Sequence, residues 1–456
     1  MGKQSVIREM TARAKLLANF RRLNFITGMR YAPIPPQLFI TNRERLTKLM
    51  LKNSLAIVNA NDVPLTNADG TLALRQNSDL FYLTGIEQEE TILLLFPDAD
   101  DEKHRAVLFL REPSEPLALW EGHKLTRDEA RRISGIEIVM WLPEFHGLFH
   151  RLMCECDHVY LNTNEHKRAV IEVDTRDARF IKDCQARYPL HDYQRLARLM
   201  HRLRIVKSDW EIDLIKKAGA ITESGFRRVL RFMKPGVGET EVEAEFAREF
   251  IRRGGGFAYQ PIIASGANAC VLHYVRNDQV CRKRDLVLLD VAASYANYNA
   301  DMTRTIPASG RFTRRQKQVY QAVLRVFRQC VRALVPGKLH KEWQKEAEQM
   351  VEKELVDLGL LTVREIKRLD PDKPAFKRYF MHGIGHPIGL DVHDVGLMTE
   401  PIRPGWVMTV EPGIYVREEG LAVRLENTVY VGEKDNVDLM AGSPIEADEI
   451  EELMNR

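Results

Sequence analysis

The 456-residue sequence has few cysteines, little net charge and no long apolar run. Its six cysteines include no Cys-x-x-Cys pair, and so few for this length suit a reducing compartment, so we expect a cytoplasmic protein. Cys154-Glu-Cys156 could form a metal or redox pair, but two separate thiols are favoured. A formal net charge of +3 argues against a nucleic-acid binder, which concentrates basic residues on one face. No run of about 18 apolar residues is present, so no membrane-spanning segment is expected.

The first 28 residues are rich in arginine and carry one acidic residue, Glu9. Such a composition is typical of an organelle transit peptide. A surface helix or a disordered arm also explains it, and a third interpretation is that Met29 is the true start. We favour these plainer interpretations and treat residues 1–30 as an N-terminal extension.

The length predicts two domains. Hydrophobic residues make up 45% and charged residues 29%, which is typical of a globular protein with substantial cores. Between residues 55 and 110, short apolar runs separated by turn signals predict buried strands: LAIV, LFYLTGI, TILLLFP and AVLFL. Helical patterns around 126–134 and 192–204 alternate with them. Residues 31–195 are therefore predicted to form an α/β domain.

The remaining residues, 196–456, combine long helices with strands. Helices are predicted at 208–233, from Thr240 onward, at 313–335 and at 341–358. Capping boxes support three of these starts: Ser208 with Glu211, Thr240 with Glu243, and Thr313 with Gln316. Strands are predicted at YQPIIAS, CVLHYV and LVLLDVAA, and later at WVMTVEPGIYV and LAVRLENTVYV. This order of elements predicts an α+β domain.

The stretch MHGIGHPIGLDVHDVG, residues 381–396, holds three histidines among several glycines. His382 and His386 are four residues apart, which on a helix would place both on one face. Gly385 and Pro387 disfavour that helix, so the two histidines are not expected to share a metal. The segment GIGHPIG resembles a dinucleotide-binding fingerprint, but its last glycine comes one position late and no strand–turn–helix surrounds it. We therefore reject nucleotide binding there.

Four carboxylates lie in or beside apolar strand segments of this second domain. They are Asp290 after LVLL, Asp301 eleven positions later beyond a turn, Glu411 before Pro412, and Glu426 in VRLENTV. A buried carboxylate is costly, and like charges close together are worse, unless a cation joins them. Taken singly, each has a simpler explanation, such as an Asp301–Arg304 or an Arg424–Glu426 ion pair.

Together these carboxylates and His386 form an oxygen-rich set without cysteine. Such a set suits Mn²⁺, Fe²⁺ or Co²⁺, with Zn²⁺ as an alternative. Four acids exceed the three protein ligands that are usual for one catalytic zinc ion. Two divalent ions bridged by carboxylates and a hydroxide fit the set better.

Five motifs, in this order, resemble those of the aminopeptidase P/prolidase family: LHYVRN, LLDVAASYANYNADMTRTIP, MHGIGHPIGLDVHDVG, TVEPGIYV and VRLENTV. LRIVKSDWEIDLIKKA and RQNSDLFYLTGIEQEE resemble the family's linker helix and N-terminal domain, so the resemblance covers nearly everything after about residue 30. It implies that residues 196–456 form a pita-bread (creatinase/aminopeptidase-like) catalytic domain. The implied reaction removes the N-terminal residue from peptides with proline at position two, by means of a metal-bridging hydroxide.

In that family two aspartates, a histidine and two glutamates bind two metal ions, most often manganese. The matching residues here are Asp290, Asp301, His386, Glu411 and Glu426. The resemblance also implies that three histidines contact the peptide at the scissile bond and that an arginine orders the site: His273, His382, His393 and Arg424. Glu411 would move the proton and His393 would stabilise the oxyanion.

Three functions remain open from the sequence. A Xaa-Pro aminopeptidase acting on longer peptides is favoured, because RQNSDLFYLTGI and MRYAPIPPQLF resemble the aminopeptidase branch of the family. A prolidase, which cleaves Xaa-Pro dipeptides, shares the same metal motifs. A non-catalytic peptide-binding relative is disfavoured because all five ligands are present. Relatives further imply a homodimer or homotetramer. Arg75 and Asp79 either reach a neighbouring subunit's site or, as we favour, form a structural turn with an ion pair.

Overall fold

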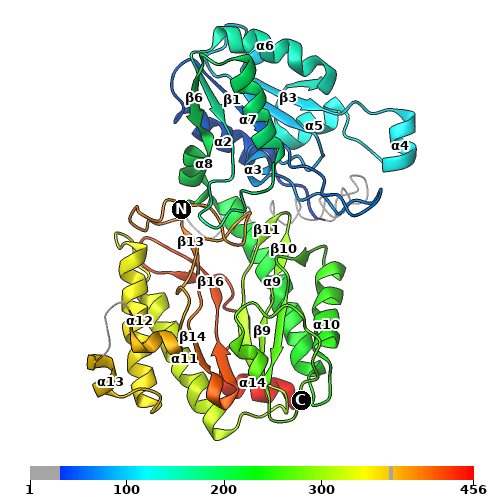
Figure 1. The fold of residues 1–456 in the computed structure, drawn as a ribbon. Coiled ribbons are helices and arrows are strands. Elements are labelled where there is room, and N and C mark those ends of the chain that lie inside the picture. Colours follow the sequence, from blue (N-terminus) through cyan, green and yellow to red (C-terminus); the bar gives the residue numbers. More distant parts are fainter. Residues whose placement is uncertain (1–30, 369–372) are drawn as a thin grey trace, which may run out of the picture. The chain divides into compact units, whose positions relative to one another are not determined.

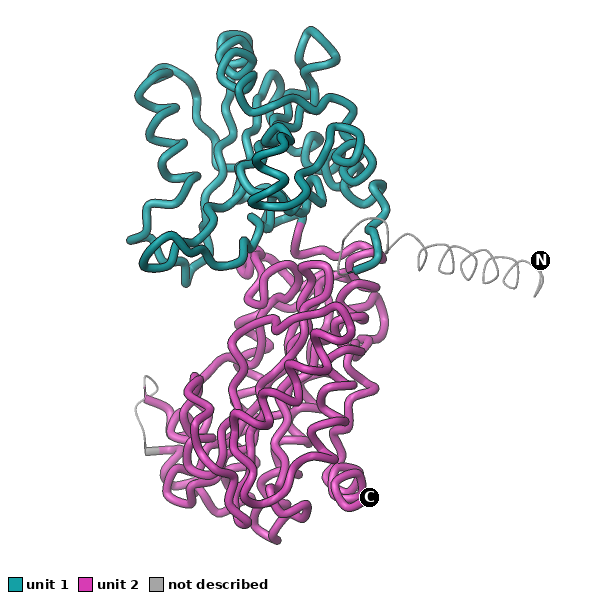
Figure 2. Tube along the Cα trace, turned by 90° about the vertical axis from the view of Figure 1, so that its right-hand side faces the viewer, with its two compact units in different colours: residues 1–203 teal, residues 204–456 magenta. Residues whose placement is uncertain are grey.

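The structure, a computed structural model, describes residues 31–368 and 373–456. It divides into two compact units, residues 1–203 and 204–456 (Figure 2). The N-terminal extension predicted at residues 1–30 lies outside the described residues. In the described part of the chain, the search for a helix long and apolar enough to cross a bilayer finds none.

Unit 1 is built around a mixed six-stranded sheet with the order β4-β3-β2-β1-β5-β6 (Figure 1). β2 is antiparallel to β1 and to β3, and the other three neighbouring pairs are parallel. The strands are β1 (Ser54–Asn59), β2 (Ile92–Leu95), β3 (Ala106–Leu110), β4 (Ile138–Trp141), β5 (His158–Leu161) and β6 (Asp192–Arg195). The helices are α2 (Pro36–Thr47), α3 (Ser78–Thr84), α4 (Glu115–Glu121), α5 (Arg127–Ser134), α6 (Phe145–Glu155), α7 (Arg176–Arg187) and α8 (Leu196–Arg204), with short 3-10 helices η1 (Glu102–His104) and η2 (Leu142–Glu144).

The central strands of unit 1 are buried along their whole length, which explains why their sequences are continuously apolar. Leu55, Ile57 and Leu94 pack against Phe149 of α6 and Cys184 of α7 in one cluster. A second group of helices comprises α3, which contacts β1 and β2, together with α2 and α5, which pack on α3. The α/β character predicted for this part of the chain follows from that layering.

Unit 2 places two pairs of packed helices against short antiparallel strands (Figure 1). α9 (Asp209–Phe232) packs on α10 (Glu239–Arg252), and α11 (Arg314–Ala333) packs on α12 (His340–Asp357). The other helices are α13 (Val363–Arg368), α14 (Ala447–Met454), η3 (Gly266–Cys270), η4 (Ala375–Arg378) and η5 (Arg417–Glu419). The strands are β7 (Gly256–Phe257), β8 (Ile262–Ser265), β9 (Leu286–Asp290), β10 (Ala293–Tyr295), β11 (Tyr298–Asn299), β12 (Thr303–Pro307), β13 (Val407–Val410), β14 (Gly413–Val416), β15 (Leu421–Arg424), β16 (Asn427–Tyr430) and β17 (Val437–Asp438).

These strands form small sheets with the orders β11-β10-β7, β12-β9-β8, β13-β16-β17 and β14-β15. An isolated bridge between Thr303 and Glu426 joins the second sheet to the third. The strand ends from the two halves of the unit are therefore brought together where the acidic residues lie.

The predicted helix starts are right at two capping boxes and wrong at the third. The carboxylate of Glu211 accepts bonds from the backbone N–H and the hydroxyl of Ser208 before α9, and Thr313 pairs with Gln316 before α11. α10 instead begins at Glu239, and its capping glutamate is Glu241, which accepts from the Gly238 N–H.

Three predicted runs adopt other structures. Residues 80–86 were predicted as a strand but lie largely in α3, because the Asn77 side chain caps that helix and Gly85, in a left-handed conformation, ends it. Residues 192–195 were predicted as helix but form β6, and helix begins only at Leu196. Residues 271–275 were predicted as a strand but form a loop after η3.

Gly85 offers a test of the α3 capping turn. Its φ is +68°, and a Cβ atom there would lie 2.3 Å from a ring carbon of Phe39. Gly85→Ala should cost about 1 kcal/mol for the left-handed backbone and roughly 1–3 kcal/mol more for overpacking. Urea-dependent hydrogen exchange of β1 measures the stability of unit 1.

Gly359 supplies the matched control, since its φ is +71° and a Cβ atom there would meet nothing within 4 Å. Gly359→Ala should lower the stability of unit 2, followed on β9, by only about 1 kcal/mol. Equal losses at the two sites would contradict the contact between Gly85 and Phe39.

Candidate metal centre

A hairpin brings Asp290 and Asp301 together. β9 and β12 are antiparallel, with Asp290 opposite Thr303, and a tight turn with two left-handed residues closes the shorter β10–β11 hairpin between them. The Tyr259 hydroxyl lies 2.7 Å from Oδ1 of both aspartates. A phenol carries one hydrogen, so it can donate to only one of the two carboxylates at a time.

Glu426 and Glu411 reach the same place from the other half of unit 2. Glu411 directly follows β13 and Glu426 directly precedes β16, the strand that pairs with β13. The Thr303 hydroxyl donates to Oε2 of Glu426 at 2.6 Å, and the Glu426 N–H donates to the Thr303 carbonyl at 3.0 Å. Thr303 therefore holds one acid of the second half against the strand that carries the aspartates of the first.

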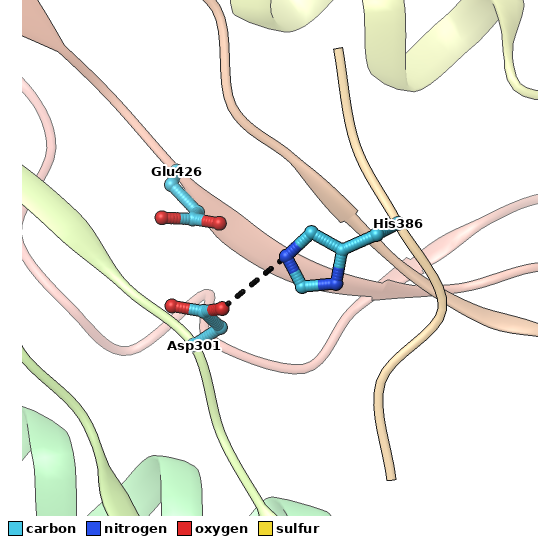
Figure 3. A group of neighbouring side chains, drawn as sticks. All are labelled: Asp301, His386 and Glu426. Atoms are coloured by element: carbon cyan, nitrogen blue, oxygen red, sulfur yellow. Dashed lines mark ion pairs between the residues drawn. The ribbon is translucent and has the colours of Figure 1, made fainter. Parts of the chain in front are cut away.

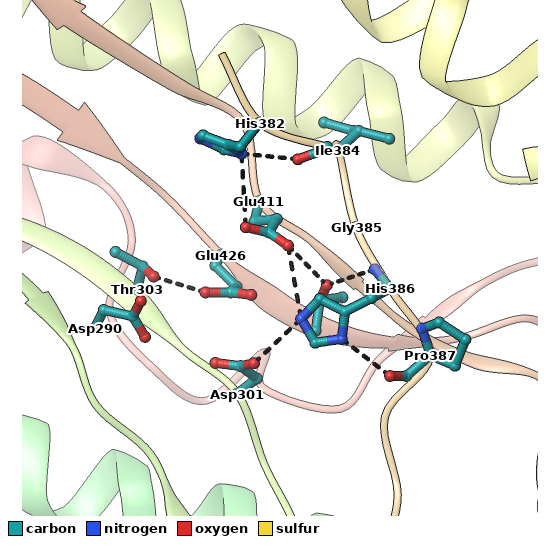
Figure 4. Close-up of polar contacts among 12 residues, drawn as sticks. Asp290, Asp301, Thr303, His382, Ile384, Gly385, His386, Pro387, Glu411 and Glu426 are labelled. Carbon is teal, nitrogen blue, oxygen red and sulfur yellow. Dashed lines mark hydrogen bonds and ion pairs between the residues drawn. The ribbon is translucent and has the colours of Figure 1, made fainter. Parts of the chain in front are cut away.

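His386 completes a cluster in which three ligand atoms converge. Its Nδ1 donates to the Pro387 carbonyl at 2.9 Å, which leaves Nε2 with its lone pair toward the acids (Figure 4). Nε2 lies 3.6 Å from Asp301 and 3.6 Å from Glu411. One ligand atom each from Asp301, His386 and Glu426 lies within 4.8 Å of the others (Figure 3).

The stretch that carries His386 contains no helix or strand, as its glycines and proline predict. The backbone amide of His386 donates to the Thr409 hydroxyl at 3.0 Å, and Thr409 N–H donates back to the His386 carbonyl at 2.8 Å. A Cβ atom on Gly385 would lie 2.0 Å from the Thr409 carbonyl oxygen. Glycine at 385 thus allows the chain to lie directly against β13.

Burial and neighbouring carboxylates raise the pKa values of Asp301 and Glu426. Burial, and after it the charge of Asp290, raise the pKa of Asp301 well above its usual value. Burial, and after it Asp301 and Glu411, raise the pKa of Glu426 in the same direction. A divalent cation would relieve both penalties, because it supplies the opposite charge that the buried acids lack. The donor set, with carboxylate oxygens and one imidazole nitrogen, fits such an ion.

Arg424 orders this cluster through Asp290. It is only 4% exposed, and its guanidinium donates to Oδ2 of Asp290 at 2.6 Å, to the Tyr415 hydroxyl at 2.8 Å and to the Thr303 hydroxyl at 3.1 Å. The simple Arg424–Glu426 ion pair considered from the sequence is therefore replaced by a pair with Asp290. Asp301 likewise has no ion pair with Arg304, which donates to backbone carbonyls and to Asn427.

The three other histidines of the motifs surround the cluster at different depths. His382 Nδ1 donates to the Gly383 carbonyl and Nε2 lies 2.8 Å from the Tyr415 hydroxyl. Burial, and after it the charge of Arg424, lower the pKa of His382 to about 3, so the ring is neutral near pH 7. A hydrogen bond from His382 to a ligand requires one of these two bonds to be exchanged.

His393 and His273 are both exposed. The ring of His393 stands edge-on to that of His386, with centroids 4.1 Å apart. His273 lies near enough to His382 to contribute to the lowering of its pKa. The buried carboxylate of Glu239 fixes the loop of His273, because it accepts bonds from the Tyr274 hydroxyl at 2.8 Å and the Gln279 N–H at 2.9 Å.

Sequence reasoning missed three residues that hydrogen-bond to the candidate site residues: Tyr259, Thr303 and Tyr415. The available signal was strand register, since Thr303 faces Asp290 across the β9–β12 pair and Tyr259 lies just before β8, whose Ile262 also faces Asp290. A tyrosine or threonine has no spacing motif of its own. Its role becomes visible only when the pairing of the strands is known.

Two family models match this chain. The model for metallopeptidase family M24 matches residues 213–433, and the model for the aminopeptidase P N-terminal domain matches residues 39–160. The chain is 32% identical to the Xaa-Pro aminopeptidase of Escherichia coli (strain K12) over 440 residues, which cover 92% of this chain and 98% of that protein. It is 32% identical to Xaa-Pro aminopeptidase 3 of Homo sapiens over 413 residues, which cover 87% of this chain and 78% of that protein.

Solved structures of similar proteins agree in fold. Aminopeptidase PepP of Pseudomonas aeruginosa superposes with a TM-score of 0.83 at 31% identity, covering 93% of this chain and 98% of that one. Zn-substituted E. coli aminopeptidase P in complex with product superposes with a TM-score of 0.82 at 32% identity, covering 93% of this chain and 99% of that one.

Thr303→Val tests whether the hydroxyl that supports Glu426 tunes the centre. The change keeps the shape of the side chain but removes the bonds to Glu426 and Arg424, so divalent-metal affinity should fall about 10-fold. Isothermal titration of the metal-stripped chain with Mn²⁺ measures the affinity.

Thr305→Val is the matched control on the same strand. Thr305 is also fully buried, but its hydroxyl bonds to the backbone of Arg424 and to none of the acids. Thr305→Val should change metal affinity by less than about 2-fold, well below the effect expected when a bond to a metal ligand is lost. A loss as large as that of Thr303→Val would sink the assignment to Thr303.

Proposed function

This chain belongs to metallopeptidase family M24 and is a metal-dependent Xaa-Pro aminopeptidase, and we propose that the acids around His386 are its catalytic centre. Its two-domain architecture, an α/β aminopeptidase P N-terminal domain before a pita-bread domain, is the one predicted from the sequence. The observation that carries the proposal is the convergence of ligand atoms from Asp301, His386 and Glu426 within 4.8 Å. We keep 31–195 and 196–456 as the proposed domain bounds.

The family uses divalent metal, and we propose two ions held by Asp290, Asp301, His386, Glu411 and Glu426. Mn²⁺ suits this oxygen-rich set, with Co²⁺, Fe²⁺ and Zn²⁺ as alternatives. Such ions lower the pKa of a bound water and polarise the scissile carbonyl. The pKa values of Asp301 and Glu426, raised by burial and by neighbouring acids, support this proposal because a cation would offset both causes.

The proposed roles of the other side chains follow from their positions. Glu411 lies 3.6 Å from His386 and 3.8 Å from His382, at the edge of the cluster, where it can take a proton from the attacking water and deliver it to the proline nitrogen. His393, exposed beside His386, would donate a hydrogen bond to the developing oxyanion. His273 and His382 would contact the peptide, and Arg424 would hold Asp290 in place.

A centre built from metal ions and histidines is suited to peptides with proline at position two, because the proline nitrogen carries no N–H. An Xaa–Pro bond is a tertiary amide and has no N–H for a protein to bind. A site made of metals and histidines acts on the carbonyl and on the leaving nitrogen, so it does not depend on that missing group. Similarity to named Xaa-Pro aminopeptidases favours this activity over prolidase, whose motifs are the same.

Location and assembly are further proposals. All six cysteines are free, and five of them are buried, which supports a reducing, cytoplasmic setting. We propose a homodimer or homotetramer from the similarity to aminopeptidase P.

The activity is tested with three peptides: Xaa-Pro-Yaa, the Xaa-Pro dipeptide, and Xaa-Ala-Yaa as the matched control. With Mn²⁺ present, we expect release of the first residue from Xaa-Pro-Yaa, because the site needs no N–H at position two. We expect little release from Xaa-Ala-Yaa, because the similar curated proteins are named Xaa-Pro aminopeptidases. Mass spectrometry of the products measures the release. Cleavage of the dipeptide alone would favour a prolidase, and cleavage of none would contradict a peptidase.

His393→Ala separates catalysis from metal binding. Loss of one oxyanion donor should lower kcat by about 100- to 1000-fold, while Mn²⁺ content stays that of the parent chain. Glu426→Ala should instead lose both activity and metal. His158→Ala is the control, since that histidine pairs with Asp192 in unit 1. If His393→Ala keeps parental turnover, its proposed role is wrong.

A further inference from the structure

The loop that carries His393 is held by four charged side chains, of which three are buried and the fourth, Asp391, is 39% exposed. The guanidinium of Arg204 donates to Asp394 at 2.5 Å and to Asp391 at 2.6 Å, and the Lys207 ammonium donates to the other oxygen of Asp394 at 2.9 Å. Arg204, Lys207 and Asp394 are 3%, 5% and 3% exposed. Two cations therefore meet two carboxylates, and the set is electrically balanced.

Such a set is an inefficient way to stabilise a fold. Taking charges out of water costs nearly as much as their mutual attraction returns, so well-packed apolar residues often do as well. Its value lies in geometry, because four charged groups with fixed partners define one arrangement of the chain segments that carry them. The segments here are the end of α8, the residues before α9, and residues 387–396.

Asp394 connects this set of four charged side chains to two histidines of the motifs, His386 and His393. Its backbone N–H donates to the Pro387 carbonyl at 2.9 Å, and the same carbonyl accepts the Nδ1–H of His386 at 2.9 Å. His393 precedes Asp394 directly and its ring lies against that of His386. The Asp394 carboxylate also accepts a hydrogen bond from the Val395 N–H at 2.9 Å, so the backbone and the side chain of Asp394 both hold the loop.

We propose that Asp394, held by Lys207 and Arg204, is a positioning residue that sets the orientation of His393 toward the substrate. The proposal rests on the proposed function of His393. The Asp394 carboxylate is buried and paired with both cations, so it offers a peptide no exposed oxygen to bind. Asp394 therefore acts on turnover through the histidines that its loop carries, and we assign its effect to His393, since its link to His386 is only the shared Pro387 carbonyl.

The test is a double-mutant cycle of Asp394→Asn with His393→Ala, assayed on Xaa-Pro-Yaa with Mn²⁺. A displacement of about 1 Å at a catalytic group can cost on the order of 100-fold in rate. We expect Asp394→Asn to lower kcat about 100-fold in the parent chain with little change in KM. In the His393→Ala background the same change should cost less than about 3-fold, because the group it positions is gone. Equal losses in both backgrounds would overturn the proposal.

Glu249→Gln is the matched control, since Glu249 is 5% exposed and also pairs with two cations, Arg252 and Arg253. It should leave kcat unchanged. If Asp394→Asn does not fold, Lys207→Met serves in its place, because it keeps the Asp394–Arg204 pair while loosening the loop. Lys207→Met should lower kcat in the parent chain but not in the His393→Ala background, and equal losses in both would again overturn the proposal.

Hydrogen exchange of residues 387–396 gives a readout independent of activity. Exchange at Asp394 and Val395 should rise at least 10-fold in Asp394→Asn and stay unchanged in Glu249→Gln, since only the former loses the bonds that fix the loop. Parental exchange in Asp394→Asn would overturn the positioning role. If the parent chain released no residue from any Xaa-Pro peptide, the proposed function would be wrong. The hydrogen-exchange measurement would still show whether Asp394 fixes the loop.

Discussion

Several carboxylates are brought to one buried point, and the surrounding structure offsets the cost of doing so. Asp290 and Asp301 share the Tyr259 hydroxyl. Glu426 accepts a hydrogen bond from the Thr303 hydroxyl, and Asp290 accepts one from the Arg424 guanidinium. Each partner satisfies one acid, yet the pKa values of Asp301 and Glu426 remain raised by burial and by their neighbours. The short sheets, their register and the bridge between Thr303 and Glu426 all serve to hold these acids within reach of one another.

Much of this arrangement can be predicted from the sequence because buried acids at strand ends are conspicuous. Asp290, Glu411 and Glu426 stand next to apolar runs, and the glycines around His386 exclude the helix that its spacing with His382 suggests. Local signals failed where two structures share one pattern. LFYLTGI is apolar enough for a strand, but the Asn77 cap and Gly85 make it a helix. CVLHYV contains a strand-like run, yet its tyrosine bonds to Glu239 and the segment forms a loop. The partners Tyr259 and Tyr415 could not be found, because their roles depend on which strands pair.

A common device supports the two exposed histidines near the cluster. His273 lies on a loop whose Tyr274 and Gln279 bond to buried Glu239, and His393 lies on a loop whose Asp394 bonds to Arg204 and Lys207. In both cases a carboxylate under the loop, rather than the histidine itself, accounts for the backbone's position. The histidines are thus left open to solvent while the backbone that carries them is held.

The Tyr259 hydroxyl can donate its one hydrogen to only one of two aspartates, so Asp301 keeps a raised pKa that affects metal binding. A raised pKa favours the protonated form of Asp301 and Glu426, so an ion that binds the proposed centre would displace protons. Acidity and metal supply then compete for the same oxygens. More acidic conditions would therefore weaken divalent-metal binding at the proposed centre even at a constant metal concentration, so its occupancy would depend on both pH and metal supply.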